Sequence, residues 1–225
     1  MFESLSQLNC HIKTCALCPR LQQWCQEVAV SKKKMHADQT YWGKPVPSFG
    51  DPLAKILIVG LAPAAHGANR TGRMFTGDRS GQFLYRALHK AGLSNQSTYE
   101  HSDDGLVLRH TWITNAVHCA PPQNKPTKEE KNNCFDYFVQ ELRLLKHVKV
   151  IIALGNIAWD IVFDAMKTLK HTDGGRVKFS HGSQYQSGPY FILGSYHPSQ
   201  QNTFTGRLTE NMFDDVFVCA QNILA

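Results

Sequence analysis

The segment GLAPAAHGANRTGRMFTGD, residues 60–78, is the stretch around which the rest of the chain is arranged. It follows the short apolar run Ile56–Val59, which is typical of a buried strand, and a helical pattern resumes only at Gly81–Leu93. The segment holds four glycines, two arginines and few large aliphatic side chains. Open α/β sheets bind ligands at the carboxyl ends of their strands, and joining a strand to a helix needs no loop of this length. The segment therefore predicts a ligand-binding loop in an α/β fold.

On either side of this loop, the sequence alternates predicted strands with predicted helices. We expect further strands at 111–117, 148–154 and 190–193, and helices at 80–93, 127–145, 155–169 and 208–224. The helix at 127–145 opens with Thr127-Lys128-Glu129-Glu130, the pattern of a capping box. Residues 1–30 are also expected to be helical, with Pro19 in a first turn, and 176–186 to form a small hairpin or an irregular excursion. The alternation predicts a mainly parallel sheet covered on both faces, within one domain spanning residues 1–225.

The composition is that of an ordered globular protein with a moderate positive charge. The 225 residues suffice for a single domain with a sizeable core, and 42% of them are hydrophobic and 19% charged. No apolar run approaches the length of a membrane span and no signal-peptide pattern opens the chain, so we expect a cytoplasmic protein with no membrane partner. The net charge of +6 weakly favours a polyanionic partner such as DNA.

Polar residues gather at the ends of the predicted strands. Asn115 ends the second strand, Ser195-Tyr196-His197 ends the fourth, and the loop 60–78 follows the first. Because the carboxyl ends of parallel strands meet at one edge of a sheet, we expect these residues at a common rim. Taken alone, Asn115 would be interpreted as a turn or cap residue and His197 as a buried, hydrogen-bonded histidine. Their shared rim favours a binding site.

The residue types at this rim suit a planar polar ligand. An asparagine amide both donates and accepts, so Asn115 can bind the edge of a base, and His197 can donate to an oxygen that gains negative charge. Phe75 is either a stacking platform or a core anchor of its loop, and Asp78 is either a site carboxylate or the N-cap of the next helix. Three arginines of the long loops are candidate phosphate contacts, with surface solvation as the alternative: Arg70, Arg73 and Arg207.

Two pairs among the seven cysteines have the character of metal ligands. Cys15 and Cys18 form a CxxC motif, whereas Cys119 and Cys134 flank a Pro-rich loop and the start of a helix. An odd number of cysteines in a chain expected to be cytoplasmic argues against a disulfide framework. The CxxC precedes the first strand, which disfavours a thioredoxin-type redox pair. The spacing leaves three interpretations open: a zinc site, a [4Fe–4S] cluster, or unliganded thiols.

Four motifs together resemble the iron–sulfur uracil-DNA glycosylases of family 5, also called type b. The resemblance runs from about Cys15 to the last helix and is carried by GLAPAAHGANRTGRMFTGD, YWGKPVPSFGDP, TNAVHCAPP and HPSQQNTFTGRLT. It implies a three-layer α/β/α fold with a four-stranded, mainly parallel sheet and an N-terminal helical cluster-binding segment over about residues 1–50. It also implies a monomer of the prokaryotic cytoplasm with a [4Fe–4S] cluster, held by Cys15, Cys18, Cys119 and Cys134.

The resemblance further implies a monofunctional DNA glycosylase that initiates base excision repair. In that family uracil, and in some members other deaminated or damaged bases, is flipped out of DNA and its N-glycosidic bond is hydrolysed. Carried over by motif, Phe75 stacks on the base, Asn115 binds its Watson–Crick edge and His197 donates to O2 of the leaving base. Gly60 and Ala62 fall among the substrate-binding positions. The DNA-binding positions are Arg70, Arg73, Asn202 and Arg207.

Two stretches depart from the wider superfamily. Many relatives hold the attacking water with an Asp, Asn or Glu in the first motif, whereas residues 61–65 are apolar here, as is typical of family 5. We therefore expect Asp78 to be catalytic, positioning the water or stabilising an oxocarbenium-like sugar. Gln200-Gln201 stands where some relatives have a Pro-Leu wedge, so we expect Phe204 or Leu208 to enter the DNA instead. A non-catalytic binder of altered DNA and a zinc-stapled nucleotide hydrolase are the alternative functions.

Overall fold

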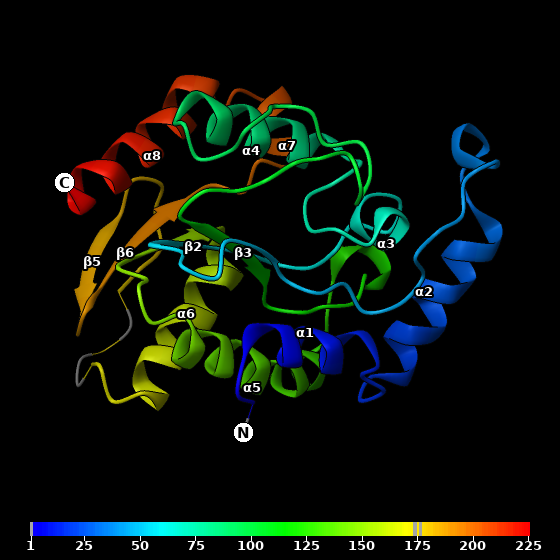
Figure 1. Ribbon diagram of the computed structural model, residues 1–225, viewed down its shortest axis with the longest axis horizontal. Coiled ribbons are helices and arrows are strands. Elements are labelled where there is room, and N and C mark those ends of the chain that lie inside the picture. The colour runs from blue at the N-terminus through cyan, green and yellow to red at the C-terminus, as the bar shows by residue number, and fades with distance from the viewer. Residues whose placement is uncertain (1, 173–174, 176) are drawn as a thin grey trace.

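One sheet with a parallel centre organises the fold. Its strands are β1 (Phe49–Gly50), β2 (Ile56–Gly60), β3 (Thr111–Asn115), β4 (Val150–Leu154), β5 (Gln184–Ser187) and β6 (Tyr190–Ser195). The computed structural model describes residues 2–172, 175 and 177–225, and within them the six strands have the order β1-β3-β2-β4-β6-β5 (Figure 1). The four central strands are parallel, and β1 and β5 pair antiparallel at the edges.

Helices cover both faces of this sheet. They are α1 (Leu5–Lys13), α2 (Pro19–Ser31), α3 (Ala68–Thr71), α4 (Arg79–Lys90), α5 (Lys128–Leu144), α6 (Asn156–Thr168), α7 (Gln200–Phe204) and α8 (Glu210–Leu224), with 3₁₀ turns η1 (Lys34–His36) and η2 (Pro122–Asn124). Figure 1 shows α4 and α8 on one side of the sheet and α1, α5 and α6 on the other. The arrangement has three layers, because each central strand needs apolar cover on both faces.

β2 and β4 have no polar side chain for this reason. All five residues of β2 are buried, and their side chains alternate between the two layers. Ile56 and Ile58 belong to the hydrophobic core under α4 and α8, whereas Leu57 and Val59 belong to the core under α5 and α6. A strand buried on both faces reads as a continuous apolar run, which is what the sequence shows.

A third hydrophobic cluster holds the N-terminal helices against the loop after β3 and against α5. It contains Leu8, Ile12, Cys18, Leu21, Cys25, Val117, Cys119, Ala120, Cys134 and Tyr137. Outside this cluster, Arg20 of α2 donates twice to the carboxylate of Glu130 in α5, with both N–O distances at 2.7 Å. The N-terminal segment is therefore fastened to the same loop and helix that carry the second pair of cysteines.

The predicted α/β fold is confirmed, with one difference in the sheet. Six strands are present in the described residues where four were expected, because two short edge strands pair antiparallel with the parallel centre. β1 has two residues in a Pro-rich stretch, and β5 is mostly polar, so neither shows the apolar pattern of a buried strand. The stretch 176–186 was expected to form a small hairpin or an irregular excursion. Its described residues 177–183 are irregular, and β5 begins at Gln184 and pairs with β6, whereas Arg176 lies outside the described residues.

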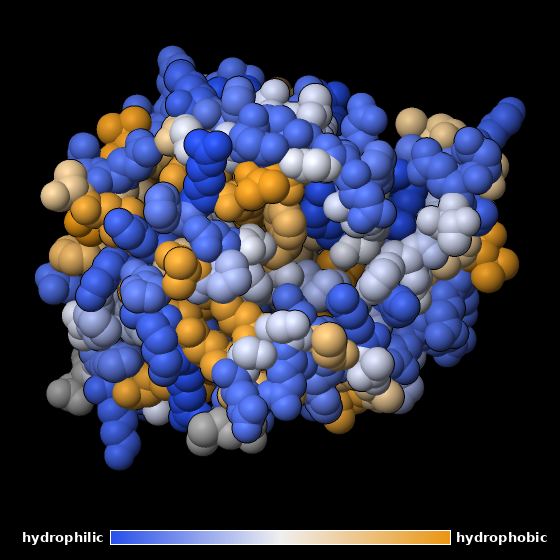
Figure 2. All heavy atoms as spheres, in the orientation of Figure 1, coloured by the Kyte–Doolittle hydropathy of each residue, from blue (hydrophilic) through white to orange (hydrophobic). Residues whose placement is uncertain are grey.

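Two local predictions are also confirmed. Thr127 and Glu130 form the reciprocal hydrogen bonds of a capping box at the start of α5, and Pro19 is the first residue of α2. No helix in the described part of the chain combines the length and apolarity that crossing a membrane requires. The face of the molecule seen in Figure 2 is mostly hydrophilic, with small separate hydrophobic areas.

Candidate active site

A cavity of about 400 Å³ opens at the carboxyl ends of β2, β3 and β6. Three predicted site residues from distant segments line it together, namely Phe75, Asn115 and His197. The other lining residues come from the loop after β2, the start of α4, and the loops after β3 and β6: Leu61, Ala62, Pro63, Ala64, Ala68, Asp78, Ser80, Gln123, Asn124, Ser199 and Gln201. The parallel sheet thus brings the predicted residues to one rim, as expected from their places at the ends of strands.

Gly60, the last residue of β2, makes room for two of these side chains. A Cβ at this position would lie 2.2 Å from Oδ1 of Asn115 and 2.8 Å from Cζ of Phe75. Both separations are far below a van der Waals contact, so any larger residue would displace one or both groups. Gly60 therefore shapes the floor of the cavity, and Ala62, the other predicted substrate-binding residue of this stretch, lies on its wall.

Asn115 presents an unpartnered acceptor next to the cavity. The residue is 2% exposed, and its Nδ2 donates to Sδ of Met74 at 2.8 Å. Its Oδ1 is buried and has no hydrogen-bond partner within the described residues. A buried acceptor without a donor carries a desolvation penalty of about 1–3 kcal/mol, which a bound ligand with an N–H group would relieve. The side chain is therefore suited to a ligand that presents an N–H donor.

The rings of Phe75 and His197 lie next to each other in the lining of the cavity. Their ring centroids are 6.0 Å apart and their planes differ by 27°, so the two rings are stacked. Phe75 is 7% exposed and has a φ of 54°, an unusual backbone value for a large residue. Strained backbone of this kind persists where the surrounding structure holds it, often at binding sites. The ring belongs to the core, which agrees with the core-anchor interpretation, and it also lines the cavity, where a role as a stacking platform stays a prediction.

Burial keeps the imidazole of His197 neutral. Desolvation lowers the pKa of His197 to about 4, so the ring carries one N–H donor and no charge at neutral pH. The backbone carbonyl of His197 accepts from Nδ2 of Asn202 and from the N–H of Ser199, both at 2.8 Å. These two hydrogen bonds hold the loop that presents the ring to the cavity.

Asp78 is both the cap of a helix and a lining residue of the cavity. Its Oδ1 accepts from the N–H of Gly81 at 2.9 Å, which makes it the N-cap of α4. Burial raises the pKa of Asp78, and hydrogen bonds from the N–H groups of Gly81 and Ser80 act in the opposite direction. Its other oxygen would lie 2.5 Å from a Cβ at Gly67, so the glycine lets the first loop close over the carboxylate. The N-cap interpretation is confirmed, and a catalytic role stays a prediction.

The chain is similar to known proteins along nearly its whole length. The family model described as "Uracil DNA glycosylase superfamily" matches residues 47–218. A type-5 uracil-DNA glycosylase of Mycobacterium leprae is 50% identical over 228 residues, covering 98% of this chain and 96% of the relative. One from Thermus thermophilus is 48% identical over 213 residues, covering 94% of each chain. A type-4 uracil-DNA glycosylase of Archaeoglobus fulgidus is 31% identical over 173 residues, covering 75% of each.

The chain belongs to the type-5 uracil-DNA glycosylases of the uracil-DNA glycosylase superfamily. The identity to the type-5 relatives is well above the 31% shared with the type-4 protein of Archaeoglobus fulgidus. The family resemblance stated from the sequence motifs is thereby confirmed.

One predicted DNA contact of this glycosylase-family chain is wrong. Arg73 is 3% exposed, and its two terminal nitrogens each lie 2.7 Å from an oxygen of Asp104. Its Nε donates to the hydroxyl of Thr76 at 2.8 Å, so all three guanidinium nitrogens have partners inside the protein. Arg70 is partly buried and donates to the carbonyls of His66 and Gly77. These arginines brace the loop 60–78, and Arg73 is not available to a phosphate.

The residues after His197 divide into buried and exposed groups. Leu208 is 1% exposed and belongs to the core, so of the two alternatives it is the one that the fold does not present to DNA. Phe204 is 64% exposed at the end of α7, and the guanidinium of Arg79 lies 4.3 Å from its ring centroid. Arg207 is exposed over the ring of Tyr196, at 4.5 Å from the ring centroid. Phe204 and Arg207 are therefore the accessible candidates on this loop.

Among the lining residues that the sequence did not predict, Gln123 and Asn124 come from a segment with no predicted site residue. Gln123 and Asn124 line the cavity from η2 and have φ values of 55° and 56°. Two successive residues in the left-handed region turn the chain sharply, which brings their side chains to the rim. The signal available in the sequence was the Pro-rich loop 120–126, which predicts a constrained turn but not its direction.

The four predicted ligand cysteines converge behind the loop 60–78. Cys18, Cys119 and Cys134 are buried in the third hydrophobic cluster, and Cys15 packs against it. The pKa of Cys119 is raised by a hydrogen bond with Cys25, by burial, and by the charges of Cys25, Cys134 and Cys15. Groups that act on one another in this way lie close together, although they come from the turn before α2, the loop after β3, and α5.

Four cysteine thiols that converge in one hydrophobic cluster are a donor set that an iron–sulfur cluster would fit. No three His, Cys, Asp or Glu side chains of the described residues are placed to hold one metal ion. Clusters of the [4Fe–4S] type are typically held by four cysteine thiolates. Amide donors next to sulfur are also present, since Nδ2 of Asn133 lies 3.4 Å from Sγ of Cys18 and the N–H of His118 bonds to Cys134. Such donors stabilise cluster thiolates.

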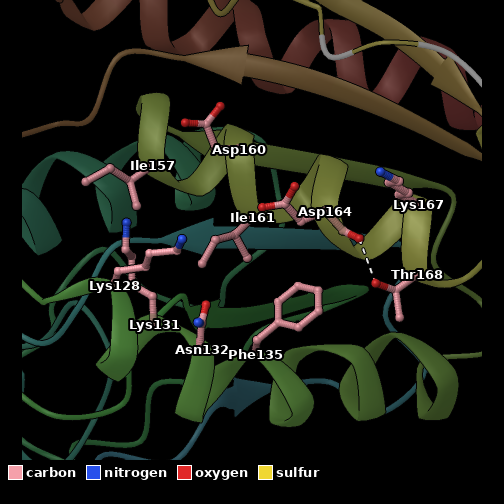
Figure 3. A pocket seen from close by; sticks show the side chains of 10 residues that line it. All are labelled: Lys128, Lys131, Asn132, Phe135, Ile157, Asp160, Ile161, Asp164, Lys167 and Thr168. Carbon is pink, nitrogen blue, oxygen red and sulfur yellow. Dashed lines mark hydrogen bonds between the residues drawn. The ribbon is translucent and has the colours of Figure 1, made fainter.

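A second hollow lies between α5 and α6 and is separate from this site. It has a volume of about 530 Å³ and carries none of the predicted site residues. Figure 3 shows Lys128 and Lys131 reaching from α5 toward α6, with Phe135 between the two helices. Asp160 and Asp164 line the opposite wall, so charges of both signs face the hollow. Its size exceeds that of the first cavity, but the convergence of functional groups is found in the first.

Proposed function

We propose that this chain is a monofunctional DNA glycosylase that binds uracil flipped out of DNA and hydrolyses its N-glycosidic bond, the first step of base excision repair. The observation that carries the proposal is the buried, unpartnered Oδ1 of Asn115 at the floor of a cavity that Phe75 and His197 also line. The relatives named type-5 uracil-DNA glycosylase, at 48% and 50% identity, support the substrate.

Asn115 is proposed to select the base. Uracil has an N–H at N3 and a carbonyl at C4, so Oδ1 can accept from the first while Nδ2 donates to the second. Cytosine has no hydrogen at N3 and carries an amino group at C4, so both contacts would become repulsive or unmade. The ring of Phe75 supplies an apolar face for stacking on the base. Other deaminated bases that present the same edge are proposed as further substrates.

His197 is proposed to stabilise the leaving group. As the N-glycosidic bond breaks, negative charge grows on the departing uracil, and O2 becomes a stronger acceptor. The neutral imidazole offers an N–H that is already desolvated, so donating it requires little reorganisation at the moment of reaction. With a pKa of about 4, the ring is uncharged at neutral pH, so it acts on the departing base through a hydrogen bond and not through a full positive charge.

Asp78 is proposed as the carboxylate of the reaction. The loop 61–64 offers only apolar side chains to the cavity, so it supplies no base for the attacking water. Asp78 lines the same cavity, and its interaction with a positively charged, oxocarbenium-like sugar would be strengthened by burial. A dissociative transition state needs little help from a base, so the carboxylate stabilises charge and orients the water.

A [4Fe–4S] cluster held by Cys15, Cys18, Cys119 and Cys134 is proposed as the cofactor. It would supply structural cross-links, and the convergence of these thiols in the third hydrophobic cluster supports the assignment. For DNA binding, Arg207 and Phe204 are the accessible side chains, and Asn202 acts through the backbone of His197. We further propose that the protein works as a monomer in the cytoplasm.

The test uses purified protein and a duplex oligonucleotide with one uracil, against the same duplex with thymine. We expect alkali-labile abasic sites from the uracil strand only, in a sample that shows the broad visible absorbance of an iron–sulfur cluster. Asn115→Ala and His197→Ala should each slow single-turnover cleavage by about a hundredfold, the usual effect of removing a contact to developing charge. Tight binding of the uracil duplex without base release, by protein with an intact cluster, would support a non-catalytic binder instead.

A further inference from the structure

A positively charged turn follows α2 and stands next to the wall of the cavity. Residues 32–44 contain four lysines and one aspartate. Lys33 and Lys34 are exposed, and within the described residues neither amino group has a hydrogen bond or an ion pair. Figure 1 shows the end of α2 and this turn on the same side of the molecule as α3, and Figure 2 shows the turn projecting from the outline of the body.

Hydrogen bonds fasten the turn to the loop 60–78. The hydroxyl of Tyr41 accepts from the N–H of Lys33 at 3.4 Å and is hydrogen-bonded to Nδ1 of His66 at 3.1 Å. Nη1 of Arg70 donates to Oε1 of Gln39 at 2.5 Å. Ala64 and Ala68, on either side of His66, line the cavity, so the turn is held at a fixed place beside the flipped-base pocket. His66 therefore has a structural role, which is to hold the turn through its hydrogen bond with Tyr41.

The positive charge of the turn is poorly compensated inside the protein. Burial lowers the pKa of His36 and of His66, and the charges of Lys33 and Arg70 lower both pKa values further. Among the described residues, Asp38 is the carboxylate whose charge opposes this effect at His36. A cluster of cations that destabilises further positive charge provides a favourable site for an anion.

We propose that this turn is a DNA-backbone site outside the base pocket, where Lys33 and Lys34 bind phosphates on one flank of the flipped nucleotide. The proposal rests on the proposed function only in taking DNA as the partner. Phosphate contacts of this kind add affinity without reading sequence, and they hold the duplex in register over the pocket. The exposed, unpaired amino groups and the rigid attachment to the cavity wall are what distinguish these lysines from other surface charges.

The test compares K33Q/K34Q with K146Q/K149Q, a control that removes two exposed lysines near the amino end of β4, opposite the cavity. Binding to an undamaged duplex is followed by fluorescence anisotropy as a function of salt, so that it does not depend on base release. Each lost phosphate contact makes the negative slope of log K against log salt less steep by about 0.9. We expect K33Q/K34Q to make the slope less steep by roughly 2 and to weaken binding at 0.15 M salt by about 30-fold, whereas the control stays within twofold of the unmodified protein.

Cleavage of the uracil duplex at saturating enzyme and low salt separates the two proposals. K33Q/K34Q should retain the unmodified single-turnover rate within twofold, because the pocket is intact. An unchanged affinity and salt slope for K33Q/K34Q, or an equal loss in K146Q/K149Q, would overturn the backbone site while leaving the glycosylase proposal standing. Unmodified protein that binds DNA through Lys33 and Lys34 but releases no uracil would overturn the glycosylase proposal alone.

Discussion

Replacing Gly60 with alanine is expected to remove most of the proposed activity while leaving the protein folded. The new Cβ would lie 2.2 Å from Oδ1 of Asn115 and 2.8 Å from Cζ of Phe75. Gly60 is not among the glycines with a positive φ, so alanine meets no backbone strain there. The effect is therefore steric, and it falls on the two side chains that are proposed to bind the base.

The size of the effect follows from what must move. Overpacking a well-filled site costs about 1–3 kcal/mol of unfolding free energy, which a domain of this size can absorb. Displacing Asn115 removes a polar contact to the reacting base, and loss of one such contact lowers rates by about 10²–10³-fold. We therefore expect Gly60→Ala to slow single-turnover uracil release by at least about a hundredfold, with a cooperative unfolding transition retained.

Two further variants test whether the effect of Gly60→Ala arises from its contact with Asn115. Gly175→Ala adds a methyl group in open space, so its single-turnover rate should equal that of the unmodified protein. In an Asn115→Ala background, Gly60→Ala should cost less than about tenfold, because the closest clash is gone and the two substitutions act on one contact. A Gly60→Ala protein that cleaves within threefold of the unmodified rate would refute the reasoning, since Asn115 and Phe75 could not then be held as the structure shows.

Three further perturbations have defined outcomes. The unfolded chain binds more protons than the folded one between pH 6.5 and about 4, because burial lowers the pKa of His197 to about 4, so stability should fall as pH drops through this window. His197→Gln should reduce that fall by up to roughly 3 kcal/mol in urea unfolding compared at pH 7 and pH 4. Arg73→Ala leaves the carboxylate of Asp104, whose pKa is held at about 2, without its partner, and should cost about 3–5 kcal/mol in the same assay. Phe204→Ala should slow cleavage of duplex uracil DNA by about tenfold or more, because stacking on a base is worth about 1–3 kcal/mol, and it should leave cleavage of single-stranded uracil DNA unchanged. As its comparison, Leu208→Ala should mainly reduce the stability of the protein, because Leu208 is buried.

Hydrophobic periodicity and strand ends were enough to predict the centre of the fold and the location of the cavity. Apolar runs buried on both faces identify the central strands, and parallel strands necessarily bring their carboxyl ends together. Asn115 and His197 could be placed at one rim for this reason, before any contact was known. The start of α5 was predictable because a capping box is a local pattern, as was the position of Pro19.

Features that depend on long-range partners could not be predicted. Arg73 looks like a surface arginine in the sequence, and its burial becomes clear only with Asp104, which a distant loop brings within 2.7 Å. The edge strands β1 and β5 form because β3 and β6 offer them an open edge, not because of their own pattern. Gln123 lines the cavity because its backbone has a positive φ, a conformation that a sequence usually signals with glycine and that glutamine does not signal.

The proposed cofactor site and the base pocket meet at the apolar start of the loop 60–78. Ala62 lines the pocket and, with Ala65, packs against the hydrophobic cluster that contains the buried cysteines. On the other side, Asn115 ends β3 and Cys119 follows it by four residues. A cluster bound at Cys119 would therefore hold in place both Asn115, at the floor of the pocket, and Ala62, on its wall, without touching the base. Two of the apolar residues in place of a water-binding side chain, Ala62 and Ala65, thus pack against the third hydrophobic cluster, while the proposed carboxylate, Asp78, lies at the other end of the loop.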